Sequence, residues 1–169
     1  MPNHCTTTLH IDGEHRHRQE FVDKNKGFSC WDTKKEKEYF DLSFHAQCPI
    51  PKKHINSHLS KSSNSDWYAW CNKNWGTKWD CYELNLEHHP NSTYYTFDTA
   101  WSPPFQWITK VSKKFPNLRF NIEWAEESGF GGTASYQDGE IFAQQEFSKK
   151  EWRDFMGYDE DDYDEDDDE

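Results

Sequence analysis

The chain is poor in apolar residues and has no long apolar run. Only 33% of its 169 residues are hydrophobic, and its mean hydropathy is −1.19. No stretch approaches the roughly 18 consecutive apolar residues of a membrane-spanning helix, so we expect no membrane partner. Residues 1–5 also lack the charged-then-apolar run of a signal peptide, which favours a cytoplasmic location.

Several motifs that mark cofactor sites and enzymes are missing. The five cysteines form no CxxC pair, and no Cys/His set has zinc-site spacing, so reduced thiols are the simpler reading. The sequence has no GxxxxGK[ST] phosphate loop, no GxSxG elbow and no HExxH helix. We therefore expect no cofactor and no metal, and non-enzymatic action is favoured over catalysis.

Aromatic residues are abundant where aliphatic ones are scarce. The chain holds 9 Trp, 8 Tyr and 12 Phe, which together make 17% of the sequence. Each buried aromatic side chain removes about 150–250 Å² from water. A core built on rings is therefore within reach, and a wholly disordered chain is excluded.

Acidity is concentrated at the C-terminus. The chain carries 31 Asp and Glu against 19 Lys and Arg, but ten of these acids lie in residues 159–169, so residues 1–158 have a net charge of only −2. A block of like charges repels itself and stays solvated. We expect a disordered, solubilising tail over residues 158–169; the alternatives are a ligand for a basic partner or a mimic of nucleic-acid phosphate.

Hydrophobic periodicity indicates alternating strands and helices. Residues 5–11 alternate apolar and polar side chains, which predicts a half-buried strand, and residues 14–23 are a plausible helix. Residues 24–65 are polar and form an insert, with a strand-like run at 39–44 and a surface loop at 54–65. Residues 67–75 have near-helical spacing.

The second half of the chain has sharper patterns. Strands are predicted at 82–86, 94–99 and 118–125, with a helix between Pro103 and Phe115. Asp138-Gly139 suits a tight hairpin turn, and Ser148 with Glu151 predicts a capping box for a last helix.

The order β-α-insert-β-β-α-β is that of a ferredoxin-like fold. The sequence therefore predicts an α+β domain over residues 1–157. Its antiparallel sheet should have helices on one face, the insert at about 24–65 after the first helix, and an extra C-terminal hairpin and helix.

Several short segments resemble a known family. They are MPN at 1–3, CPIP at 48–51, NWGTKWD at 74–80, FDTAWSPP at 97–104, FPNL at 115–118 and GFGG at 129–132. Over about residues 1–147 the chain resembles the YubB-like ferredoxin-like proteins of phages, conjugative plasmids and their bacterial hosts. The resemblance implies the same ferredoxin-like topology and implies little chemistry; no cysteine spacing supports an iron–sulfur cluster.

Two of these segments are expected to meet. If the strands at 82–86 and 94–99 form an antiparallel hairpin, Asp80 and Asp98 become near neighbours. The candidate binding patch comprises Asn74, Trp75, Lys78, Trp79, Asp80, Asp98 and Trp101. The two carboxylates are open to three interpretations: an acid–base pair, a structural network that caps backbone donors with Lys78 neutralising one acid, or part of a binding surface.

The function expected from these features is protein–protein interaction. We expect a non-enzymatic accessory protein in the cytoplasm of a bacterial host cell that binds a host or phage protein, with inhibition of a defence system as its most specific form. One alternative is that exposed aromatic side chains bind single-stranded nucleic acid or a nucleotide. The other is a hydrolytic enzyme that uses Asp80 and Asp98. Nucleic acid is disfavoured because the basic residues are scattered, as in KKEK at 34–37. The sequence does not indicate an oligomeric state.

Overall fold

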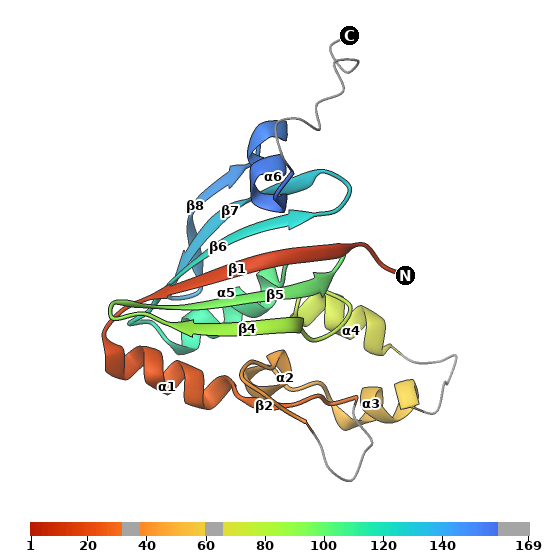
Figure 1. Cartoon of the computed structure of the whole chain (residues 1–169). Coiled ribbons are helices and arrows are strands. Elements are labelled where there is room, and N and C mark those ends of the chain that lie inside the picture. Colours follow the sequence, from red (N-terminus) through yellow and green to blue (C-terminus); the bar gives the residue numbers. More distant parts are fainter. Residues whose placement is uncertain (32–37, 60–65, 159–169) are drawn as a thin grey trace.

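The structure is a computed structural model that describes residues 1–31, 38–59 and 66–158 (Figure 1). Its main sheet has six strands in the order β4-β5-β1-β6-β7-β8, and every neighbouring pair is antiparallel. The outer strand β4 spans Tyr82–His88. The α+β ferredoxin-like fold predicted from the sequence is confirmed. The expected acidic tail, at residues 158–169, lies outside the described residues except for Tyr158.

The centre of the sheet follows from the alternation at the N-terminus. β1 (His4–Asp12) pairs with β5 (Ser92–Ala100) on one side and β6 (Arg119–Glu126) on the other. Its odd-numbered residues from Cys5 to Ile11 are buried, and the residues between them are half-buried. One face of the sheet therefore belongs to the core and the other is open to solvent.

Helices cover the core face. α1 (His15–Asn25), α4 (Trp67–Asn74) and α5 (Phe105–Lys114) contribute rings and aliphatic side chains to one cluster with the sheet. The largest fully buried side chains are Trp75, Trp107, Tyr95, Tyr136, Phe21, Phe44, Phe97 and Phe120. The aromatic core expected from composition is thus present.

The C-terminal additions extend the sheet as predicted. β7 (Phe130–Gln137) and β8 (Glu140–Glu146) form a hairpin whose turn residues, Asp138 and Gly139, have φ of 50° and 80°. Two positive φ values are what a type I′ turn requires, and they explain the Asp-Gly pair. Ser148 and Glu151 form the predicted capping box at the start of α6 (Lys149–Met156).

The insert differs in part from its prediction. β2 (Gly27–Phe28) pairs with β3 (Tyr39–Phe40), and α2 (Phe44–Gln47) follows, so the strand-like run at 39–44 is a strand for two residues only. The loop predicted at 54–65 is wrong over 54–59, because α3 (Lys52–Leu59) packs against α4; residues 60–65 are not described. Polarity concealed this helix because only a few of its side chains face the protein.

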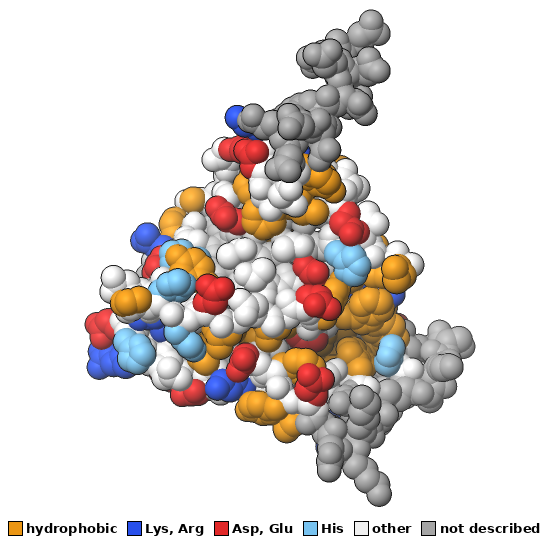
Figure 2. Space-filling view, viewed as in Figure 1, with side chains coloured by type: hydrophobic (Ala, Val, Ile, Leu, Met, Phe, Trp, Pro, Cys, Tyr) orange, Lys and Arg blue, Asp and Glu red, His pale blue; other side chains and the backbone are white. Residues whose placement is uncertain are grey.

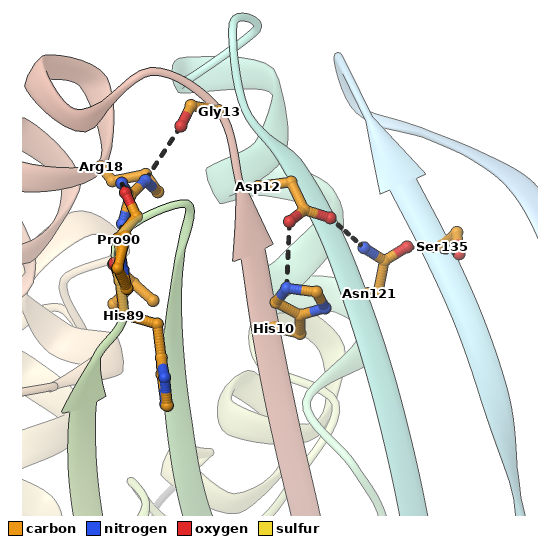
Figure 3. Close-up of polar contacts among 9 residues, drawn as sticks. His10, Asp12, Gly13, Arg18, His89, Pro90, Asn121 and Ser135 are labelled. Carbon is orange, nitrogen blue, oxygen red and sulfur yellow. Dashed lines mark hydrogen bonds and ion pairs between the residues drawn. The ribbon is translucent and has the colours of Figure 1, made fainter.

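The face of the sheet without α1, α4 and α5 is polar. Figure 2 shows Asp and Glu side chains across this face, while the Lys and Arg that it shows lie toward the margin. One network crosses three strands: His10 Nε2 lies 3.0 Å from Asp12, the Asn121 amide donates to Asp12 at 3.1 Å, and Ser135 donates to Asn121 at 2.7 Å (Figure 3). This face therefore lacks the basic footprint of a phosphate-binding sheet.

Candidate binding surface

The two segments that were expected to meet are joined by hydrogen bonds. The Thr77 hydroxyl donates to the Ala100 carbonyl at 2.9 Å, and the Ser102 hydroxyl donates to the Gly76 carbonyl at 2.6 Å. Gly76 has a φ of 87°, and a Cβ there would collide with the Gln106 side chain. The loop after α4 is thereby held against the end of β5, and it presents Lys78 and Trp79 beside Trp101.

Two members of the predicted patch are internal supports. Trp75 is fully buried, and its indole N–H donates to the Cys48 carbonyl at 2.9 Å. The Asn74 side-chain oxygen accepts from Lys110 Nζ at 2.6 Å. These contacts tie α4 to the insert and to α5, so Asn74 and Trp75 position the surface without forming it.

Asp80 is a half-buried cap. Its carboxylate accepts from the Ser43 hydroxyl at 2.7 Å and from the backbone amides of Phe44 and Cys81 at 2.8 and 2.9 Å. Burial raises the pKa of Asp80 above its usual range, and these donors partly offset that shift. The geometry is that of the structural network considered for this residue, with the carboxylate at the N-terminus of α2.

Asp98 lies elsewhere. It stands on the open face of β5, where its carboxylate accepts from the Thr6 hydroxyl at 2.7 Å. Its cross-strand neighbour Tyr82 donates to, or accepts from, His4 Nδ1 at 2.7 Å, and burial together with the Asp98 charge raises the pKa of Tyr82 to about 12. The Asp80 carboxylate binds groups at the N-terminus of α2, whereas the Asp98 carboxylate binds Thr6 on the open face of the sheet. The two carboxylates therefore do not form a shared acid–base site.

Lys78 is surrounded by rings. Its Nζ lies 4.3 Å from the ring centroid of Trp79, 5.2 Å from that of Trp101 and 6.0 Å from that of Tyr68. We call these four residues the Lys78 cluster. Among the described ion pairs none involves Lys78, so the expectation that it neutralises Asp80 or Asp98 finds no support. Its charge is held by aromatic faces instead.

The rings of the Lys78 cluster remain open to solvent. Trp101 is 45% exposed and Tyr68 is 44% exposed. Figure 2 shows hydrophobic side chains gathered at this side of the molecule, over the ends of β4 (Tyr82–His88) and β5. The aromatic surface continues from Tyr68 through Trp67 to His58 and Trp31. Burial and the nearby Lys78 lower the pKa of His58, which favours a neutral imidazole among these rings.

Trp101 has an unusual backbone. Its φ is 67°, a left-handed conformation that is rare for a bulky side chain. The amide of Trp101 donates to the Asn3 carbonyl at 2.9 Å, and the Ser102 amide donates to the Ala100 carbonyl at 2.9 Å. These bonds hold the turn in which β5 ends, and the turn directs the indole outward. Such strained positions are found preferentially at functional sites.

A groove adjoins this surface. It has a volume of about 560 Å³ and lies between the insert and the start of β4. Trp31 and Trp79 line it together with Tyr39 and Phe40, and four acids also line it: Glu38, Asp41, Asp80 and Glu83. Glu83 sits at a register irregularity of β4 with a φ of 49°.

The described residues contain no candidate metal site. They contain no group of three or more His, Cys, Asp or Glu placed to hold a metal ion. None of the five cysteines, all of which lie in the described residues, forms a disulfide. Burial raises the pKa of both Cys5 and Cys71 to about 12, which keeps these thiols protonated. No helix in the described part of the chain is long and apolar enough to cross a membrane.

Sequence reasoning missed several residues of this surface. Trp31, Tyr68 and Glu83 were not singled out, and Glu38 and Asp41 lie in a region whose pattern was weak. The only signal available for Tyr68 was its place in a Trp-rich helix. Nothing in the alternation of 82–86 marks Glu83, because its left-handed backbone arises from pairing with β5.

A family model matches the C-terminal part of the chain, which contains part of this surface. The model describes a ferredoxin-like domain in Api92-like protein and matches residues 74–167, more than half of the chain. The chain belongs to this family. All seven residues of the predicted patch, Asn74 to Trp101, lie within the matched segment.

A solved structure supports the fold of this Api92-like chain over nearly its whole length. The crystal structure of a protein api92 from Yersinia pseudotuberculosis superposes with a TM-score of 0.69 at 9% identity, covering 88% of this chain and 99% of that one. At this identity the likeness concerns the fold alone. No curated protein matches the chain in sequence.

Proposed function

We propose that this Api92-like chain is a non-enzymatic binding protein that recognises another protein through the Lys78 cluster and the adjoining groove. The observation that carries the proposal is the exposure of Trp101 and Tyr68 around Lys78 in a chain otherwise short of apolar side chains. Trp and Tyr are enriched among the residues that dominate protein interfaces. A left-handed backbone at Trp101 that directs its indole outward is consistent with a function at the surface.

The electrostatics support a protein partner over nucleic acid. Exposed rings stack on single-stranded bases, but affinity for nucleic acid comes largely from Lys and Arg on phosphates. The described groove lining contains four acids and no Lys or Arg, and Lys78 is the single base of its cluster. A polyanion would be repelled from this surface.

The positions of the carboxylates do not support hydrolysis by Asp80 and Asp98. Asp80 is occupied by a hydroxyl and backbone amides, and Asp98 by Thr6 on the other side of the sheet. A general acid–base pair needs both groups within reach of one substrate.

The cellular setting is part of the same proposal. The segments at 74–80 and 97–104 resemble the YubB-like proteins of phages, conjugative plasmids and bacterial hosts. We place the protein's action in the bacterial cytoplasm, on a host or phage protein, with inhibition of a defence system as its specific form.

Affinity capture from a bacterial lysate tests the proposal. The baits are the full-length wild type and two variants. In Trp101→Asn the new residue tolerates a left-handed backbone. Phe130→Asn is the control, because it removes a ring that is 69% exposed and lies outside the surface. A partner protein should be retained by the wild type and the control and lost with Trp101→Asn. Protein binding at this surface would be rejected if Trp101→Asn retained the partner as well as the wild type does, or if nuclease treatment abolished retention. It would also be rejected if no partner were retained and a substrate screen found turnover.

A further inference from the structure

We infer that the groove beside β4 accepts an extended, positively charged segment of the partner protein. This inference rests on the proposed function and names the chemistry of its ligand. It uses a different part of the surface from the exposed rings of Trp101 and Tyr68, and it depends on the groove's charge, its walls and the strand at its edge.

The groove's charge calls for a cation. Of its four acids, Asp80 is committed to the N-terminus of α2, which leaves Glu38, Asp41 and Glu83 facing the groove from both walls. No Lys, Arg or His occurs among the described lining residues. Lys26 is a neighbour of Asp41, but its Nζ is 4.0 Å away and that carboxylate remains 55% exposed. A partner that brings Arg or Lys complements this arrangement.

The walls suit the same ligand. Trp31, Tyr39 and Trp79 line the groove, and aromatic faces attract guanidinium and ammonium groups while packing the methylene stems of Arg and Lys. The protein already uses this interaction nearby, where Lys78 Nζ lies 4.3 Å from the Trp79 ring centroid. A cationic side chain therefore meets both a ring and a carboxylate.

An extended backbone is indicated by the sheet. β4 is an outer strand that pairs with β5 alone among the described strands, so its other side presents unpaired N–H and C=O groups. Extended peptides add to such edges, and alternate side chains then reach pockets on one face.

Glu83 is the residue expected to set specificity. The register of β4 shifts between Tyr82 and Asn85, and Glu83 adopts a φ of 49° within this irregularity. Strand bulges redirect side chains at functional edges. Glu87, in the same strand, is exposed and does not line the groove, so it provides a matched control.

Titration with synthetic peptides tests the inference. The probes are blocked eight-residue peptides that alternate Val with Arg, with Gln or with Glu, added to the full-length chain and followed by calorimetry and by NMR of Trp indole N–H signals. The Arg peptide should bind and the other two should not. Glu83→Gln, and separately Asp41→Asn from the opposite wall, should weaken binding about two- to fivefold, as expected for one partly screened ion pair, whereas Glu87→Gln should leave it unchanged.

The signals separate groove binding from attraction to the acidic C-terminal segment. The indole N–H signal of Trp31 should shift. The indole N–H signal of Trp152 in α6, which donates to the Glu126 carbonyl of β6, should not shift. The inference would be overturned if Glu83→Gln and Glu87→Gln weakened peptide binding equally. It would also be overturned if the Trp31 indole signal did not shift in a folded protein. If the inference fails but a lysate partner is still lost with Trp101→Asn, the proposed function stands without the groove ligand. If no partner is captured but the Arg peptide binds through Glu83, the groove inference stands and the proposed function fails.

Discussion

Arg18 is the side chain on which the junction between α1 and the β4–β5 turn depends most directly. It is only 3% exposed, yet its guanidinium faces carbonyls and a hydroxyl, with no carboxylate among its described hydrogen-bond partners. It donates to Gly13 and Pro90 at 2.9 Å (Figure 3) and to His89 at 3.3 Å. One buried cation thus donates to carbonyls of two turns.

We predict that Arg18→Met lowers the free energy of unfolding by about 2–4 kcal/mol, because three part-buried carbonyls and the buried Thr93 hydroxyl lose a charged donor. Urea denaturation measures the change. Arg16→Met is the control: this neighbour has a side chain that is 75% exposed, and Glu14 is its one ion-pair partner among the described residues, so its loss should stay within about 0.5 kcal/mol. Equal effects of the two substitutions would contradict this role for Arg18.

Asp80 gives a prediction about pH. Its pKa is raised in the folded protein by burial, whereas the unfolded chain has the usual value of about 3.9. Between these two values the native state binds more protons than the unfolded state, so stability falls as pH rises. The free energy of unfolding of the wild type should therefore decline, relative to Asp80→Asn, as pH increases from about 3.9 through the folded pKa.

Urea unfolding of both proteins from acidic to neutral pH measures this difference. The slope of the difference carries the result, since Asn also alters the hydrogen bonds by a constant amount. A difference that moves in favour of the wild type with rising pH would show that the amide donors outweigh burial at Asp80.

At the scale of elements, β4 combines regular and strained backbone. Glu83 has a φ of 49°, and Glu87 pairs regularly with Tyr94. A left-handed residue with a side chain costs about 1–2 kcal/mol relative to glycine, while glycine in a regular strand costs about 0.5–1 kcal/mol.

Glycine substitutions in β4 should therefore have opposite effects. We predict that Glu83→Gly raises the free energy of unfolding by about 0.5–1 kcal/mol and that Glu87→Gly lowers it by a similar amount. Thermal and urea denaturation check both. If the groove binds a cation through Glu83, the stabilised variant should also bind the Arg peptide less tightly; destabilisation by Glu83→Gly would contradict the strain at this position.

The whole molecule divides its charge unevenly. Residues 159–169 carry ten of the 31 acids, and the remaining 158 residues are nearly neutral at −2. This segment has one aromatic residue, Tyr163, and otherwise no apolar side chain to bury.

Deletion of residues 159–169 should leave the free energy of unfolding within about 0.5 kcal/mol, or raise it slightly through weaker self-repulsion. Thermal unfolding of the truncated and complete chains measures the effect. Affinity for the captured partner should also be the same with and without these residues at every salt concentration. A truncated chain that stays folded and no longer binds would instead assign the segment to recognition.

The sequence determined the fold to a large extent, because the patterns that define it are local. The two-residue period of 5–11 and 118–125, the Asp138-Gly139 turn and the Ser148–Glu151 capping box each specify an element by short-range chemistry. Together with the order of the elements, they indicated the ferredoxin-like arrangement. The insert was the exception, since α3 is stabilised mainly by packing on α4 and its own sequence is polar.

The tertiary structure alone decided which residues of the predicted patch face solvent. Asn74, Trp75 and Asp80 lie in the same short segment as Lys78 and Trp79. Long-range hydrogen bonds with Lys110, Cys48 and Ser43 nevertheless engage their side chains. Lys78, Trp79 and Trp101 come together because Thr77 and Ser102 join two segments more than 20 residues apart. Burial and strand register depend on these distant contacts, and for that reason the sequence could name the members of the candidate patch but could not separate its buried side chains from its exposed ones.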